Sequence, residues 1–217
     1  MSLRINDIAP NFTAETTQGT LTWHDYIGDG YTVLFSHPKD FTPVCTTEFS
    51  AAAKLAGEFA KRNCKLAGIS IDGVEEHKKW MDDVRTYGGT AMSFPIIADP
   101  DLTVAKLYDM LPAEAYLPDG RTANDTATVR TTFIIGPDKK IRLMLIYPMS
   151  VGRNFSEILR ALDAIRQTDG QPFATPADWQ PGDDVIVALS VTTEDAKARF
   201  GQVDVPLPYL RKTKAPN

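Results

Sequence analysis

The chain has 217 residues, enough to bury a full core, and its 28 acidic and 23 basic side chains give a formal net charge of −5. This charge argues against a nucleic-acid-binding surface, which would need a clustered excess of lysine and arginine. Residues 1–7 lack the apolar core of a secretory signal, and no apolar run approaches the roughly 18 residues of a membrane span. We therefore expect a cytoplasmic protein with no nucleic-acid partner and no membrane partner.

The first half of the chain alternates between strand-like and helix-like segments. In chain order, the patterns predict a hairpin of residues 12–17 and 20–23, a buried strand over 31–35, a helix from 43 to about 62, a strand over 66–71, a helix over 74–87, a strand over 94–98 and a short helix from 102. Such alternation implies crossover connections, and therefore a largely parallel sheet in an α/β fold.

The second half is predicted to contain a hairpin and a long helix before its composition changes. Residues 130–135 and 141–147 flank a turn, and Asn154 caps an amphipathic helix that ends near Gly170. The next dozen residues are rich in turn formers, which is typical of a boundary. Beyond them we expect a strand over 184–189, a short helix near 193–200 and a proline-containing tail whose basic residues 211–214 are solvated.

The most informative motif is Pro-Lys-Asp-Phe-Thr-Pro-Val-Cys, which runs from Pro38 to Cys45 directly after the predicted buried strand. Thr42 and Pro43 are typical of the cap and the first residue of a helix. Cys45 then falls in the first turn, where unpaired amides and the helix dipole favour a thiolate. Ionisation raises the reactive fraction of a thiol at pH 7 only about thirtyfold, whereas enzymes commonly accelerate reactions at least about a millionfold. Other groups must therefore stabilise the transition state.

These residues resemble the peroxidatic-cysteine loop of the peroxiredoxins, and the match over residues 36–48 is most similar to the one-cysteine peroxiredoxin 6 group. Further matches follow in the order of the family, at residues 9–12, 60–63, 94–97, 136–140, 147–148, 152–155 and 174–179. The resemblance implies a thioredoxin-like fold with a small C-terminal extension. It divides the chain into a peroxidase domain, residues 1–168, and a dimerisation arm, residues 169–217, that packs against a second subunit.

The resemblance also implies the chemistry. A thiol-dependent peroxidase reduces hydrogen peroxide and organic hydroperoxides, its cysteine becomes a sulfenic acid, and an external thiol or other reductant recycles it. The family does this without a metal, flavin or haem, as a homodimer or a higher oligomer. A stoichiometric peroxide sensor, or a holdase-like binding protein that uses the same thiol, is the alternative from a non-enzyme class.

The resemblance assigns catalytic roles to Cys45, Thr42, Arg130 and Pro38: the threonine and arginine hold the peroxide and the thiolate, and the proline limits solvent access. Among the supporting residues, His37 lies near the sulfur, and Glu48 and Arg153 support the loop and its hydrogen bonding. Taken without the resemblance, Arg130 has the pattern of a surface cation and His37 that of a structural side chain. The three histidines of the chain have no metal-ligand spacing.

The second cysteine, Cys64, is the internal candidate to reduce an oxidised Cys45. A helix between them would separate their Cα atoms by nearly 30 Å, whereas a disulfide tolerates only about 7 Å. Within one subunit Cys64 is therefore expected to be structural, and a cysteine of another subunit is left open. Mammalian members of this group are also associated with phospholipase A2 activity through a serine. Gly30 stands at that position here, so the activity is not carried over, although His24 and Asp138 match the proposed partners.

Overall fold

The computed structural model describes residues 2–116 and 127–215, and the chain divides into two compact units between Phe155 and Ser156. The first unit contains β1 (Thr13–Thr16), β2 (Gly19–Thr22), α1 (Trp23–Ile27), β3 (Tyr31–Ser36), α2 (Pro43–Lys61), β4 (Cys64–Ser70), α3 (Val74–Gly88), β5 (Ile96–Ala98), α4 (Thr103–Leu107), the 3-10 helix η1 (Ala113–Tyr116), β6 (Arg130–Ile135) and β7 (Ile141–Tyr147). These elements confirm the predicted α/β fold and add α1, which the pattern did not predict.

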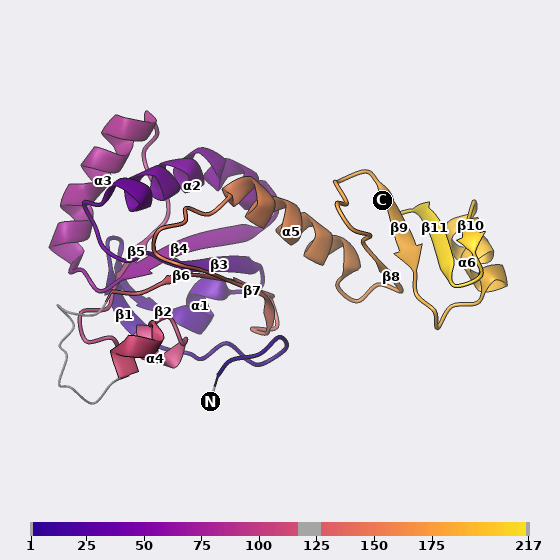
Figure 1. The fold of residues 1–217 in the computed structure, drawn as a ribbon, viewed down its shortest axis with the longest axis horizontal. Helices are drawn as coiled ribbons and strands as arrows, with labels where there is room; N and C mark the ends of the chain where they lie inside the picture. The colour runs from indigo at the N-terminus through magenta and orange to yellow at the C-terminus, as the bar shows by residue number, and fades with distance from the viewer. Residues whose placement is uncertain (1, 117–126, 216–217) are drawn as a thin grey trace. The chain divides into compact units, whose positions relative to one another are not determined.

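The first unit is built on a seven-stranded sheet in the order β2-β1-β5-β4-β3-β6-β7, with α2 and α3 over one face and α1 and α4 over the other (Figure 1). The pairs β3–β4 and β4–β5 are parallel, whereas the other four pairs are antiparallel. The prediction of a largely parallel sheet is therefore wrong. The crossover helices do produce a parallel centre, but hairpins occupy both edges and β6 returns antiparallel to β3.

The antiparallel pairing of β6 with β3 positions the site. Phe35 near the end of β3 lies opposite Thr132, so Arg130 at the start of β6 lies beside the loop that follows β3. That loop leads into α2, whose buried face includes Cys45 and Phe49. Gly68 of β4 allows the close approach of this helix, because a Cβ there would lie 2.6 Å from the ring of Phe49.

The second unit contains α5 (Phe155–Thr168), β8 (Phe173–Ala174), β9 (Asp184–Val187), α6 (Thr193–Phe200), β10 (Asp204–Leu207) and β11 (Leu210–Lys214). Its four strands form a separate sheet in the order β10-β11-β9-β8. The prediction of a solvated basic tail is wrong, because Arg211 is buried and donates to the carbonyls of Val191 and Ala188. The tail has few apolar residues, so its sequence pattern did not predict a hairpin. In the described part of the chain, no helix is both long enough and apolar enough to cross a membrane.

Candidate active site

Cys45 lies in the first turn of α2 and has no exposed surface. Proline at the first helical position and an extended Thr42 before it start the helix where the sequence predicts. Arg130 Nη1 lies 3.4 Å from the sulfur, and its Nε donates to the carbonyl of Met149 at 2.8 Å. A permanent cation is therefore in direct contact with the thiol, from a residue 85 positions further along the chain.

Glu48, one turn after the cysteine, joins two arginines beneath the sulfur. Its Oε2 accepts from Arg130 Nη1 at 2.6 Å and from Arg153 Nη2 at 2.8 Å. Its Oε1 accepts from the backbone amide of Arg153 at 2.7 Å and from its Nε at 2.9 Å. Arg153 Nη1 continues to the carbonyl of Thr131 at 3.1 Å. The predicted residues Cys45, Arg130, Glu48 and Arg153 therefore form one hydrogen-bonded cluster.

The charge of this cluster favours an anion at the sulfur. All three ionisable side chains are buried, and two guanidinium groups share one carboxylate, so the cluster carries one net positive charge. Burial alone would raise the pKa of Glu48, but the hydrogen bonds and charge of Arg153, aided by the charge of Arg130, hold it below its ordinary value. Because Glu48 remains ionised, a thiolate at Cys45 would make the whole cluster neutral.

Thr42 lies near Cys45 in the chain, but its side chain is engaged elsewhere. Its hydroxyl donates to the carbonyl of Lys39 at 2.9 Å and makes no capping bond to α2, so the predicted side-chain cap is wrong. The carbonyl of Thr42 instead accepts from the amide and hydroxyl of Thr46. Within the described residues, no hydrogen bond joins the Thr42 hydroxyl to the sulfur. Pro38 is buried in the loop before α2.

His37 belongs to a second buried group, which it forms with Asp40 and His77. Its Nε2 lies 2.7 Å from Asp40 Oδ1, while Nδ1 of His77 lies 2.6 Å from Asp40 Oδ2 and Nε2 of His77 lies 3.2 Å from the carbonyl of Ile97. Both ring nitrogens of His77 therefore face acceptor oxygens. Burial alone would raise the pKa of Asp40, but the hydrogen bonds of the two histidines hold it below its ordinary value.

The remaining nitrogen of His37, Nδ1, is buried and has no partner among the described residues. Burial lowers the pKa of His37, and Asp40 offsets this only in part. The geometry is that of a neutral ring with its proton on Nε2. His37, Asp40 and His77 are also residue types that can bind a metal ion, and their ligand atoms lie close together. Zinc, however, binds nitrogen and oxygen at about 2.0–2.2 Å each, so it would have to force apart contacts of 2.6 and 2.7 Å.

Sequence reasoning missed the roles of Asp40 and His77, although both lie in segments that it described. The loop and α3 are brought together by the tertiary fold, which sequence spacing does not reveal. One signal was present: His77, Trp80 and Val84 follow one another at helical spacing, and all three are buried in α3. A histidine on such an apolar stripe needs a buried partner, and a carboxylate is the strongest candidate.

The positions of Cys64 and Gly30 bear on two other reactions, namely reduction of Cys45 by Cys64 and a serine-dependent phospholipase activity. From Cys45 to Lys61, α2 rises about 24 Å, and Cys64 follows beyond its end, far outside the roughly 7 Å reach of a disulfide. Cys64 is buried, like Cys45, and the two are not joined by a disulfide. At Gly30 a Cβ would lie 2.5 Å from the backbone oxygen of Asn63, so no serine fits without moving the backbone.

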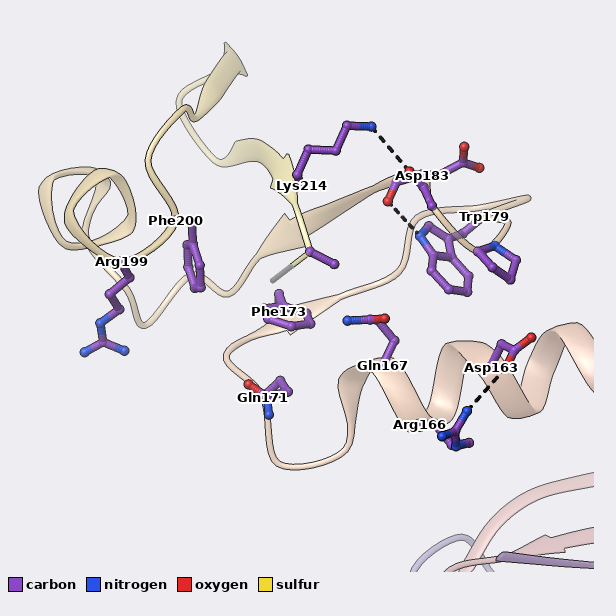
Figure 2. Close-up of a pocket in the computed structure, with 13 residues that line it drawn as sticks. Asp163, Arg166, Gln167, Gln171, Phe173, Trp179, Asp183, Arg199, Phe200 and Lys214 are labelled. Atoms are coloured by element: carbon purple, nitrogen blue, oxygen red, sulfur yellow. Dashed lines mark hydrogen bonds and ion pairs between the residues drawn. The ribbon is translucent and has the colours of Figure 1, made fainter. Parts of the chain in front are cut away.

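A hollow of about 890 Å³ lies in the second unit, lined by side chains of α5, α6 and the loop around Trp179 (Figure 2). Its lining includes Asp163 and Arg166, which form an ion pair at 3.7 Å, and Lys214. None of the predicted site residues lines it, and its lining contains no cysteine. The candidate site is therefore the buried cluster around Cys45 rather than this hollow.

The fold and the site together define a thioredoxin-like protein that holds a buried thiol against a cation. Residues 5–144 match the AhpC/TSA family, and residues 164–202 match the C-terminal domain of 1-Cys peroxiredoxin. The chain is 53% identical over 216 residues to peroxiredoxin PRX1, mitochondrial, of Saccharomyces cerevisiae, covering 98% of this chain and 81% of that protein.

Solved structures agree with these matches. A cysteine-to-serine mutant of the peroxiredoxin 6 of Arenicola marina superposes with a TM-score of 0.91 and 44% identity, over 100% of both chains. A yeast mitochondrial 1-Cys peroxiredoxin superposes with a TM-score of 0.89 and 52% identity, over 98% of this chain and 99% of that one. The chain belongs to the peroxiredoxin family, in its one-cysteine branch. It is a thiol-dependent peroxidase, and the comparisons do not favour the sensor or holdase alternative.

Proposed function

We propose that Cys45 is the peroxidatic nucleophile and that Arg130, held by Glu48, stabilises both its thiolate and the transition state. The observation that carries this proposal is the 3.4 Å contact between Arg130 Nη1 and the sulfur inside a buried cluster with net positive charge. The thiolate attacks one peroxide oxygen, an S–O bond forms and the O–O bond breaks. Hydroxide or alkoxide leaves with the electron pair and takes up a proton, and Cys45 is left as sulfenic acid.

Thr42 and Pro38 complete the proposed catalytic group. A hydroxyl has one proton and two lone pairs, so Thr42 can donate to Lys39 and still accept a hydrogen bond from the peroxide. The buried ring of Pro38 keeps water from the site. His37 is proposed to interact with the oxidised cysteine or the reductant, and Glu48 and Arg153 to support the loop. Exchange of Thr42 for valine should slow peroxide reduction, whereas exchange for serine should preserve it.

The substitution Arg130→Met tests the role assigned to the cation. Loss of one preorganised donor commonly costs about 100- to 1000-fold in rate, so the second-order rate constant for peroxide should fall by that amount. Arg130→Lys retains a charge but has no planar fork, and should recover only part of the rate. A control at the exposed Arg85 should leave the rate unchanged. An Arg130→Met protein that reacts with peroxide at the wild-type rate would refute the assignment.

We propose an external thiol as the reductant, because Cys64 is out of reach of Cys45. The solved yeast relative is described as resolved through glutathione/thioredoxin systems, which makes glutathione and thioredoxin the first candidates. Sustained peroxide consumption should be lost in Cys45→Ser and retained in Cys64→Ser. Glutathione, thioredoxin, ascorbate and small dithiols should be compared with the same purified protein. If Cys64→Ser stops turnover with every reductant, a resolving role for Cys64 of another subunit replaces this proposal.

We propose that the protein is a cytoplasmic homodimer in which residues 169–217 serve as the dimerisation arm after a peroxidase domain of residues 1–168. Exposed apolar side chains in that arm support a partner surface, since Leu189 is 76% and Tyr209 66% exposed. Two cysteines that are not joined by a disulfide fit a reducing compartment, although the yeast relative is named as mitochondrial. Light scattering would test the assembly, including higher oligomers, and cell fractionation would test the compartment.

A further inference from the structure

The buried position of Cys45 creates a problem for the second half of the proposed cycle. The side chain has no exposed surface, yet the reductant must bring its sulfur into line with the breaking S–O bond. An attacking thiol must approach the sulfur on the side opposite the bound oxygen, and no surface of Cys45 is exposed for that approach. The first turn of α2 has to open before the reductant can attack.

Several polar contacts keep this turn closed. The amide and hydroxyl of Thr46, the residue after the cysteine, both donate to the carbonyl of Thr42, at 3.0 and 2.9 Å. The same hydroxyl oxygen accepts from Nε1 of Trp80 at 3.1 Å, which joins the turn to α3. Oxidation converts a thiolate into a neutral sulfenic acid and so removes the charge attraction to Arg130. The contact between Trp80 and Thr46 persists through that step.

Trp80 is placed so that it cannot easily find another partner. It is fully buried, its ring stacks on His37 with centroids 4.9 Å apart, and it packs against Phe49 at 4.8 Å. When the first turn opens, Thr46 moves away and the indole N–H is left without its acceptor. A buried donor without a partner is strongly unfavourable, so this contact opposes opening.

We propose that Trp80 is a positioning residue that acts through Thr46 to hold the turn of Cys45 closed, and thereby sets the rate of thiol-dependent recycling. The inference rests on the proposed function of Cys45. In the recycling step a thiolate attacks the sulfenic sulfur, an S–S bond forms, the S–O bond breaks and the oxygen leaves as water after protonation. A second thiol then displaces Cys45 as thiolate and becomes part of a disulfide.

The experiment measures the two half-reactions separately by stopped flow, with hydrogen peroxide as oxidant and dithiothreitol as the probe thiol. Thr46→Val removes the acceptor while keeping the shape of the side chain. It should accelerate reduction of the sulfenic acid about tenfold, which corresponds to about 1.4 kcal/mol, without accelerating oxidation. Thr46→Ser keeps the hydroxyl and should retain the wild-type rate. Thr47→Val is the matched control, since that hydroxyl lies in the same turn but donates to the carbonyl of Val44.

Trp80→Phe tests the donor. It should also accelerate reduction, and the double variant with Thr46→Val should be no faster than the faster single variant, because both remove one contact. The proposal is overturned if Thr46→Val reduces no faster than Thr47→Val, if Thr46→Ser is as fast as Thr46→Val, or if the two effects add. Should Trp80→Phe fail to fold, the threonine series alone decides. Failure of the underlying function would be distinct, since wild-type Cys45 would then show no oxidation phase.

Discussion

Replacing Glu48 with glutamine should be among the most destabilising single changes in this protein. The two oxygens of Glu48 accept four hydrogen bonds from Arg130 and Arg153, at 2.6 to 2.9 Å, and all three side chains are buried. Glutamine has nearly the same volume, so it leaves no cavity. It removes the negative charge, however, and replaces one acceptor oxygen with an NH₂ group that must face N–H donors.

The size of the destabilisation follows from the two guanidinium groups that would lose their carboxylate partner. Removing one partner of a buried ion pair typically costs about 3–5 kcal/mol, and domains of this kind have a total stability of about 5–15 kcal/mol. The effect should also depend on pH. Because the pKa of Glu48 lies below its ordinary value of 4.5 in the folded protein, its contribution is complete above the pKa of the unfolded chain. That contribution is lost as the pH falls through the folded-state pKa, so wild type and Glu48→Gln should converge in acid.

Urea unfolding at pH 7 and at a series of lower pH values measures this difference. The dependence of the unfolding free energy on urea concentration should be the same for both proteins, which indicates a common unfolded state. Glu58→Gln is the matched control. Glu58 lies on the same helix and pairs with Lys61 at 2.7 Å and Arg62 at 3.0 Å, but on an exposed surface where solvent screens the charges. Equal midpoint shifts for Glu48→Gln and Glu58→Gln would refute the reasoning.

Three further changes can be followed by the same unfolding assay. Gly30→Ser should destabilise the protein by about 1–3 kcal/mol, because the new Cβ would meet the backbone of Asn63, and it should confer no phospholipase activity. An unchanged unfolding midpoint would contradict this. Burial holds the pKa of His37 below its ordinary 6.5 despite Asp40, so the unfolded chain takes up a proton first and stability should decline as the pH falls below about 6.5. His37→Gln should flatten that decline. Asp99→Ala should cost about 1 kcal/mol, because its carboxylate caps the first turn of α4.

Local signals predicted the part of the site that is local in the chain. Pro43 at the first helical position and the apolar spacing after it define α2, and they place Cys45 in its first turn. No such signal could place Arg130, because its approach to the sulfur depends on the antiparallel pairing of β6 with β3. The resemblance to a family supplied that contact, whereas spacing alone favoured a surface cation.

The sequence pattern was least informative where contacts form between distant segments of low apolar content. The hairpin of β10 and β11 has a proline in its first strand and charged residues in its second, so no alternation indicated a sheet. Arg211 is nevertheless buried, because carbonyls of a distant loop satisfy its guanidinium group. His77 was overlooked because its partner Asp40 lies 37 positions away in the chain.

The net charge of the cluster has consequences for both halves of the proposed cycle. Two guanidinium groups and one carboxylate surround Cys45, and this net positive charge supports the proposed attack of a thiolate on peroxide. The same charge acts again when a second thiol attacks the mixed disulfide, because an exchange is faster when the departing sulfur is a stable thiolate. The intermediate states of Cys45 are neutral and leave one positive charge uncompensated in the protein interior. Oxidation therefore weakens the attraction that keeps the turn closed, and the return of the thiolate restores it.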